Sequence, residues 1–185
     1  MEVGKSASIL QSRQVLALRR WLVEPSGAIQ DPAQRRRARA CGLRGEQLES
    51  VYRGALLHDI GKMAMPDSIL SKHAELNEEE DAIMRTHPGV AVDMLSSIAF
   101  LRPAMDVPAY HHEWWDGSGY PYGLRGEGIP LTTCIFAVVD AWDALLSDRP
   151  YRKAWTREHV IEHLKRQSGI QFDPQIVKRF LSLNP

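Results

Sequence analysis

The amino-acid sequence predicts an all-α protein with one long glycine-rich loop. Apolar residues recur every three to four positions along most of the 185 residues, and no segment shows the apolar–polar alternation of a half-buried strand. The stretch 131–146 is mostly apolar and long enough for a helix that is buried on most sides. Residues 116–130 contain five glycines and two prolines, so this segment must be a loop.

The N-terminal part of the chain is also predicted to be helical. A first helix ends before Pro25 and has an apolar face formed by Val15, Leu18 and Leu22. Asp31-Pro32 predicts an N-cap followed by proline at the first helical position, which opens a short basic helix that ends at Gly42. We interpret residues 1–45 as a divergent helical segment, a linker or a dimerising helix, and residues 46–185 as the main domain.

The remaining helices are expected to place histidines and aspartates at their ends. The helix after Gly45 carries His58 and Asp59 in its last turn. Asn77 has the capping-box spacing to Glu80 and predicts a helix that runs toward His87. Two further helices start at prolines, one after Pro103 that delivers His111 and His112, and the last at Asp173-Pro174.

Six residues of this kind recur in one ordered stretch: His58, Asp59, His87, His111, His112 and Asp140. Imidazoles and carboxylates without cysteine suit a borderline-hard divalent metal such as iron, manganese or zinc. Six ligands exceed what one catalytic metal needs, so two metals that share a bridging carboxylate are the economical interpretation. For any one of these residues alone, a satisfied core histidine or a helix-end aspartate is the simpler interpretation. The ordered set favours metal binding.

The spacing of these residues agrees with that interpretation. Neighbouring residues of a helix point about 100° apart, so His58 and Asp59 cannot both face one metal from the middle of a regular helix. At a helix end they can straddle two metals, with the Asp59 carboxylate between them. Asp140 lies inside an apolar helix, where an unpaired carboxylate is strongly disfavoured, and a metal would compensate its charge.

The segment from Ala55 to Pro185 resembles the HD-GYP family, a branch of the HD phosphohydrolases. The matching motifs are LLHDIGK at 56–62, HP at 87–88, HHEWWDGSGYPYGLRGEGIP at 111–130, VVDAWDAL at 138–145 and RPYR at 149–152. The resemblance implies an all-α HD-domain helical bundle whose long Gly-rich loop carries the GYP motif. It also implies a carboxylate-bridged metal centre that hydrolyses the bacterial second messenger cyclic di-GMP. On this basis residues 46–185 are predicted to be an HD-GYP domain.

The resemblance also assigns roles to individual residues. His58, Asp59 and Asp140 would hold one metal, and Asp59, His87, His111 and His112 would hold the other, with iron or manganese favoured over zinc. Catalysis would involve Asp59 and Lys62, and the substrate phosphates would be contacted by Lys62, Arg149 and Arg152. Helix-end stabilisation by Lys62 and surface salt bridges by the arginines are the alternatives.

The GYP motif itself is Gly119, Tyr120 and Pro121. Glycine lets the backbone turn sharply, and Tyr120 offers a flat face on which a guanine base could stack. The family implicates this motif in activity and in contacts with GGDEF-domain partners. The alternative is a rigid loop that only roofs the site.

One family feature is missing from this chain. Members carry a histidine on a helix upstream of the HD helix, where it completes the shell of the first metal. No histidine precedes His58 here, and the equivalent position falls on Ser26 or Gln11, depending on the alignment. The site formed by His58, Asp59 and Asp140 is therefore expected to bind metal more weakly, and a third metal is not expected.

Composition limits the classes of binding partner and the cellular location that are expected. Lys+Arg and Asp+Glu both number 23, so attraction for a phosphodiester must be local, and binding to a nucleic acid polymer is not expected. Cys41 and Cys134 have no metal-ligand spacing and are expected to be free thiols in a reducing cytosol. Without an apolar run of membrane-spanning length or a signal peptide, the sequence predicts a cytoplasmic protein that does not enter the membrane.

The leading prediction is a metal-dependent phosphodiesterase that hydrolyses cyclic di-GMP to the linear dinucleotide, GMP or both. Two alternatives stay open. The chain could be a catalytically weak module that senses cyclic di-GMP or docks a GGDEF partner, which the missing histidine favours. It could also hydrolyse another phosphoester, as other HD enzymes do. The sequence also leaves a homodimer open.

Overall fold

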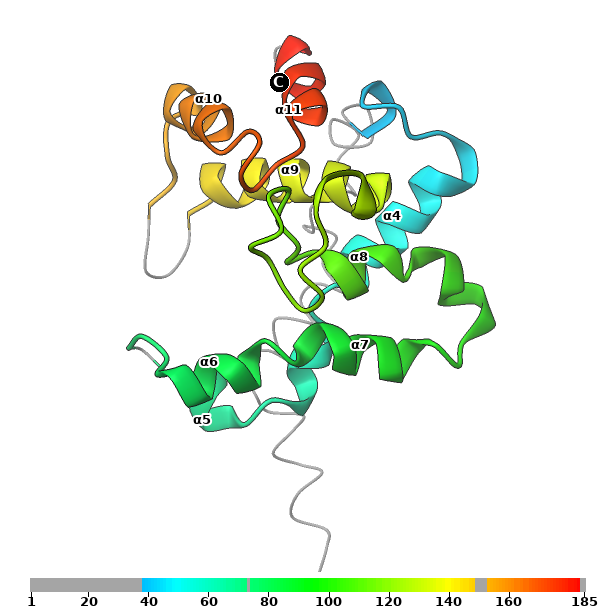
Figure 1. Ribbon diagram of the computed structural model, residues 1–185, viewed down its shortest axis with the longest axis vertical. Coiled ribbons are helices and arrows are strands. Elements are labelled where there is room, and N and C mark those ends of the chain that lie inside the picture. Colours follow the sequence, from blue (N-terminus) through cyan, green and yellow to red (C-terminus); the bar gives the residue numbers. More distant parts are fainter. Residues whose placement is uncertain (1–37, 73, 149–152, 184–185) are drawn as a thin grey trace, which may run out of the picture.

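The computed structural model describes residues 38–72, 74–148 and 153–183, and these residues form helices and loops without a named strand. The all-α prediction is therefore confirmed. In chain order the elements shown in Figure 1 are α4 (Gly45–Leu57), η1 (Ile60–Ala64), α5 (Asp67–Leu70), α6 (Glu78–Met84), α7 (His87–Leu95), η2 (Ala99–Ala104), α8 (Asp106–Tyr110), η3 (Gly126–Gly128), α9 (Leu131–Leu146), α10 (Arg157–Arg166) and α11 (Pro174–Ser182).

Helix α9 is the centre of the hydrophobic core. Figure 1 shows it crossing the upper part of the molecule, with α10 and α11 above it and α4 and α8 below. Its buried side chains include Ile135, Val138 and Trp142, and the Trp142 ring meets Phe180 of α11 edge-on with 5.4 Å between centroids. Because α9 is buried on most of its faces, its sequence shows the nearly continuous apolar run that predicted it.

A second group of elements lies below this core and consists of η1, α5, α6 and α7 (Figure 1). Two glycines allow the close helix contacts that join the parts. A Cβ on Gly54 of α4 would lie 2.7 Å from the carbonyl oxygen of Ala104 and 2.9 Å from the Cβ of Val107. A Cβ on Gly61 of η1 would overlap the carbonyl oxygen of His87 at the start of α7. These contacts bring the ends of α4, α7 and α8 together.

Several predicted helix boundaries are confirmed. Helix α9 covers 131–146, Asn77 and Glu80 form a full capping box for α6, and the Asp173 carboxylate accepts hydrogen bonds from the first turn of α11. Residues 38–40 are helical and Gly42 has a φ of 115°, in agreement with the predicted helix end there. The predicted helix at 15–22 lies outside the described residues.

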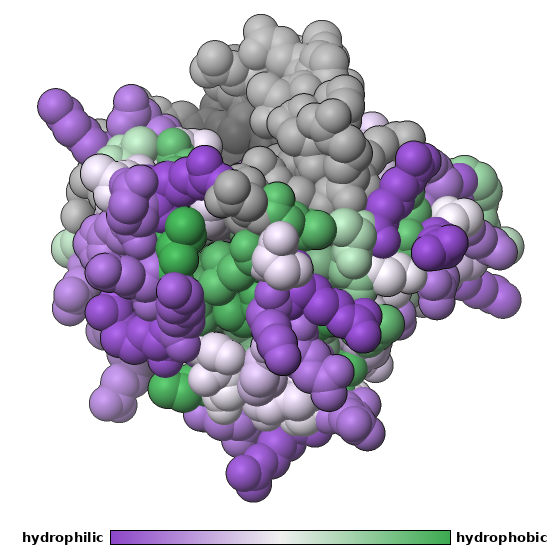
Figure 2. Space-filling model, turned by 90° about the horizontal axis from the view of Figure 1, so that it is seen from above, coloured by the Kyte–Doolittle hydropathy of each residue, from purple (hydrophilic) through white to green (hydrophobic). Residues whose placement is uncertain are grey.

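Within the described part of the chain, no helix is both long and apolar enough to cross a membrane. The face seen from above in Figure 2 carries a central apolar area, with hydrophilic side chains to its left, right and below.

Candidate metal centre

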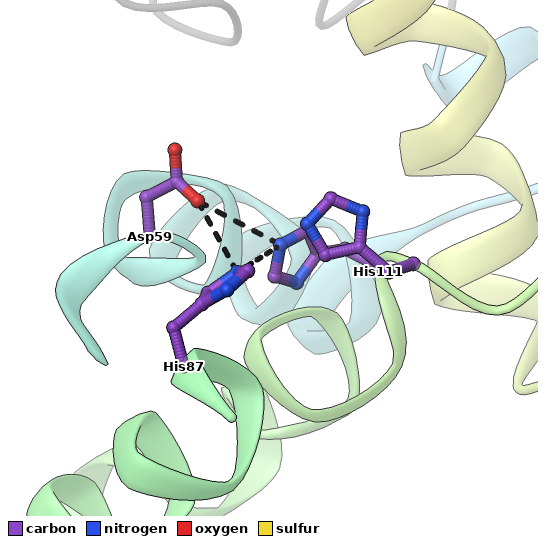
Figure 3. Close-up of side chains that lie close together, drawn as sticks. Asp59, His87 and His111 are labelled. Carbon is purple, nitrogen blue, oxygen red and sulfur yellow. Dashed lines mark hydrogen bonds and ion pairs between the residues drawn. The ribbon is translucent and has the colours of Figure 1, made fainter. Parts of the chain in front are cut away.

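Four of the six predicted ligands form one tight group. Asp59, His87, His111 and His112 each offer a ligand atom, and these four atoms all lie within 4.8 Å of one another. Figure 3 shows the Asp59 carboxylate and the rings of His87 and His111 pointing toward a common centre. Three separate segments therefore meet at one point.

The local backbone explains how the segments meet. Helix α4 ends at Leu57, so His58 is its C-cap and Asp59 precedes η1 with a φ of −97°. Pro88 starts a new helix in α7, which places His87 at that helix's first position. His111 is the C-cap of α8, and His112 follows it. Each ligand lies at a helix end, where adjacent side chains are free of the regular 100° rotation.

Hydrogen bonds to the backbone orient two of the rings. The Nδ1 atom of His87 lies 2.8 Å from the carbonyl oxygen of Met84, and that of His111 lies 3.1 Å from the carbonyl oxygen of Val107. A carbonyl only accepts, so each Nδ1 carries the hydrogen and each neutral ring turns the Nε2 lone pair inward. The two Nε2 atoms are 3.2 Å apart. Two lone pairs that face each other at this distance repel, and a metal ion bound by both nitrogens would relieve that repulsion.

The protonation states of the four residues also suit metal binding. Burial lowers the pKa of His87 to about 4 and that of His112 to about 2, and burial also lowers the pKa of His111. Burial alone would raise the pKa of Asp59, but the adjacent His111 and His58 rings and the charge of Lys62 hold it well below its usual range. At neutral pH the group is three neutral imidazoles and one carboxylate, a donor set that fits iron, manganese or zinc.

His58 and Asp140 lie beside this group, not in it. The Nε2 atom of His58 is 3.4 Å from Oδ2 of Asp59, and the His58 ring packs against Phe136 of α9 at 5.2 Å between centroids. Burial lowers the pKa of His58, but the carboxylates of Asp59 and Asp140 outweigh it and raise that pKa overall. The two predicted ligand sets are thus unequally assembled, because only the set with His87, His111 and His112 is drawn together.

Lys62 contacts the same carboxylate. Its Nζ donates a hydrogen bond of 2.7 Å to Oδ2 of Asp59, while Oδ1 of Asp59 lies 3.5 Å from His87 and 3.7 Å from His111. A cation thus lies at the edge of the group of four residues. Arg149 and Arg152, the other two predicted phosphate contacts, lie outside the described residues.

The GYP loop packs directly on the ligands. A Cβ on Gly119 would overlap the backbone of His112 and Trp114, so only glycine allows this approach. The Tyr120 backbone N–H donates a hydrogen bond of 3.0 Å to the carbonyl oxygen of His112, and the Tyr120 ring stacks on the His112 ring. Pro121 follows at the exposed surface. The GYP loop therefore touches one of the four residues of the group.

Glu113 is a site residue that the sequence argument missed. Its side chain is buried, and its carboxylate accepts hydrogen bonds from the backbone N–H groups of Tyr122, at 2.7 Å, and Leu124, at 2.8 Å. It thereby fixes the GYP loop immediately after His112.

The two histidines of α10 do not join the group. On α10 the His159 ring stacks on Trp155, and the His163 ring meets the same indole edge-on. Neither belongs to a metal-ligand group among the described residues.

Known proteins resemble this chain in sequence and in fold. A family model described as HD domain matches residues 11–176. The chain is 44% identical over 146 residues to the cyclic di-GMP phosphodiesterase response regulator RpfG of Xanthomonas campestris, covering 78% of this chain and 39% of that protein. This chain belongs to the HD-GYP family of HD domains. The family match starts at residue 11, so it includes most of the segment that was interpreted as divergent.

Further relatives of this HD-GYP chain come from Vibrio cholerae. It is 40% identical over 148 residues to a 3′3′-cGAMP-specific phosphodiesterase, covering 79% of this chain and 28% of that protein. A solved structure of a cyclic GMP-AMP-specific phosphodiesterase from the same organism shares the fold, with a TM-score of 0.57, 19% identity and coverage of 80% of this chain and 43% of that one. The chain thus spans about two-fifths or less of these relatives.

Proposed function

We propose that this chain is a metal-dependent phosphodiesterase that hydrolyses a cyclic dinucleotide, with cyclic di-GMP as the leading substrate. The observation that carries the proposal is the pair of inward-facing Nε2 lone pairs of His87 and His111, 3.2 Å apart beside the ionised Asp59 carboxylate. The relatives of this chain include phosphodiesterases that are named for two different cyclic dinucleotides.

In the proposed reaction, water adds to one phosphorus, the phosphorus bond to a ribose oxygen breaks, and that oxygen takes up a proton. A bound divalent ion would polarise a phosphoryl oxygen. Asp59, His87, His111 and His112 would hold the ion, and Lys62 would place positive charge where the phosphate oxygens gain negative charge. We further propose that Asp59 bridges to a second, weaker site at His58 and Asp140.

The substrate is argued from the relatives and the motif residues. The relative with 44% identity is named for cyclic di-GMP, whereas one with 40% identity is named for 3′3′-cGAMP. These two molecules share the phosphodiester ring and differ in one base, so base recognition decides between them. Arg149 and Arg152 remain predicted phosphate contacts. GGDEF-domain partners, a homodimer and a cytoplasmic location also remain predictions.

Chromatographic analysis of products tests the proposal. Anaerobically purified protein, reloaded with Fe²⁺ or Mn²⁺, is incubated with cyclic di-GMP and, separately, with 3′3′-cGAMP. We expect the linear dinucleotide, GMP or both from cyclic di-GMP, and no product from an Asp59→Asn variant. Asp93→Asn is the matched control, because Asp93 is an exposed aspartate on α7 outside the ligand group. Full activity in Asp59→Asn would exclude the proposed site.

A sensing module is the second candidate. No histidine precedes His58 in this chain, and the set of His58, Asp59 and Asp140 is loosely assembled. If the metal-loaded protein binds cyclic di-GMP tightly and forms no product, the sensing function replaces the enzymatic one. Preferential turnover of 3′3′-cGAMP would keep the reaction and change the substrate.

A further inference from the structure

The ring of His112 differs from the other histidines around the metal group. His58, His87 and His111 each have Nδ1 within 3.1 Å of a backbone carbonyl oxygen, which fixes the ring and the tautomer. The His112 ring forms no hydrogen bond with any residue that the structure describes. Metal-binding histidines almost always use their second nitrogen in this way, so another contact must orient this ring.

The Tyr120 ring is the contact that replaces the hydrogen bond. Its centroid lies 4.6 Å from that of His112, and the two planes are inclined by 20°. A flat neutral ring stacked on an imidazole restricts its rotation about χ2 without competing for its nitrogens.

Arg85, at the end of α6, places its guanidinium over the Tyr120 ring. Its guanidinium carbon lies 4.9 Å from the Tyr120 centroid, and its Nε donates a hydrogen bond of 2.6 Å to Asp81 one helical turn earlier. Arg85 is the C-cap of α6 and precedes the ligand His87 by two residues. The contact therefore joins the segment that carries His87 to the loop that follows His112.

We propose that Tyr120 is a positioning residue for the metal ligand His112 and that Arg85 holds Tyr120 in place. The inference rests on the metal site proposed above and gives the GYP tyrosine a task within that site. Arg85, stacked on the phenol ring and paired with Asp81, completes the arrangement. Tyr120 thereby acts through His112 and not as a platform for a guanine base.

Metal affinity is the direct test. The dissociation constant for Mn²⁺ is measured by competition with a chelator for the parent chain, Tyr120→Leu and Tyr120→Phe. We expect Tyr120→Leu to bind Mn²⁺ about tenfold more weakly, the lower range for loss of a residue that orients a ligand, and Tyr120→Phe to stay within about threefold of the parent. Tyr122→Leu is the matched control, because that exposed ring contacts Tyr110 and not a ligand; it should bind as the parent does.

A double-mutant cycle with His112→Ala shows whether Tyr120 acts through the His112 ring or supports the whole metal site. If Tyr120 acts through His112, Tyr120→Leu causes no further loss of Mn²⁺ affinity once His112 is removed. Equal losses in both backgrounds overturn the inference, and so does unchanged affinity in Tyr120→Leu alone. A parent chain that binds no Mn²⁺ or Fe²⁺ refutes the proposed metal site instead.

Arg85 provides an independent variant at an exposed position. Arg85→Leu removes the guanidinium from the phenol ring, whereas Arg85→Lys keeps a cation there. We expect Arg85→Leu to weaken Mn²⁺ binding about threefold to tenfold, with Arg85→Lys between it and the parent. Should Tyr120→Leu fail to fold, this pair decides the inference, and parent-like affinity in Arg85→Leu overturns it.

Discussion

Gly61 lies against the backbone of His87 so closely that no side chain fits between them. A Cβ on Gly61 would overlap the carbonyl oxygen of His87 and lie 2.8 Å from the backbone nitrogen of Ala91. This contact sets the position of η1, and with it Asp59, relative to the first turn of α7. The metal group therefore depends on a glycine that binds nothing.

Gly61→Ala tests this dependence. The methyl group must push η1 away from α7, so we expect a loss of about 1–3 kcal/mol in the free energy of unfolding, together with weaker metal binding. Urea unfolding with chelator present gives the first quantity, and Mn²⁺ titration gives the second. Gly89→Ala in α7 is the matched control, because a Cβ on Gly89 meets nothing within 4 Å. Equal stability of the two variants would refute the close contact.

Glu113 is expected to stabilise the GYP loop as a buried acceptor. Glu113→Ala leaves the N–H groups of Tyr122 and Leu124 without their partner, at a cost of about 1–3 kcal/mol for each group that stays unsatisfied. Urea unfolding measures the loss. Glu127→Ala removes an exposed carboxylate from the same loop and should change stability by less than about 0.5 kcal/mol. If both variants unfold alike, Glu113 does not hold the loop.

Lys62 is expected to act on the reaction more than on metal binding. Lys62→Ala should lower the turnover of cyclic di-GMP about a hundredfold, as for loss of one preorganised cation, with the metal content unchanged. Lys72→Ala is the control, since Lys72 pairs with Glu80 on α6 and not with Asp59. Loss of metal from Lys62→Ala would show that the lysine mainly supports Asp59, and unchanged turnover would remove it from the mechanism.

The metal-free protein should become less stable as the pH falls from about 6.5 toward 4. The pKa of His87 is lowered to about 4, so in this range the unfolded chain binds more protons and acid favours unfolding. The lowered pKa of Asp59 acts only below its unfolded value, and the raised pKa of His58 acts only above about 6.5.

Urea unfolding at pH 7 and pH 5, with chelator present, measures this effect. Linkage gives a loss on the order of 2 kcal/mol from His87 alone between these two pH values. His87→Gln, which cannot be protonated, should show a correspondingly smaller pH dependence than the parent. A parent chain that is equally stable at both pH values would contradict neutral, buried ligand histidines.

Features that depend on local chemistry were predictable from the sequence. The capping box of Asn77 and the bounds of α9 follow from side chains within one turn or one apolar run. The four residues whose ligand atoms lie within 4.8 Å of one another are all among the six candidates taken from the ordered motifs. The contacts of Glu113 and Arg85 were not predictable in the same way, because they depend on segments that meet only after folding.

The unequal assembly of the two ligand sets was also only partly predictable. The missing upstream histidine indicated a weaker site at His58 and Asp140, and the structure leaves these two outside the tight group. What the sequence could not show is that Lys62 occupies the second oxygen of Asp59, the atom expected to bridge to that site.

Anomalous X-ray scattering from crystals of the Fe²⁺- or Mn²⁺-loaded protein tests the central claim most directly. The account predicts a strong peak between Asp59 and the Nε2 atoms of His87 and His111, with His112 as the fourth ligand and a weaker or absent peak at His58 and Asp140. A crystal with the metal bound only elsewhere, or with no metal at these four residues after loading, would contradict it.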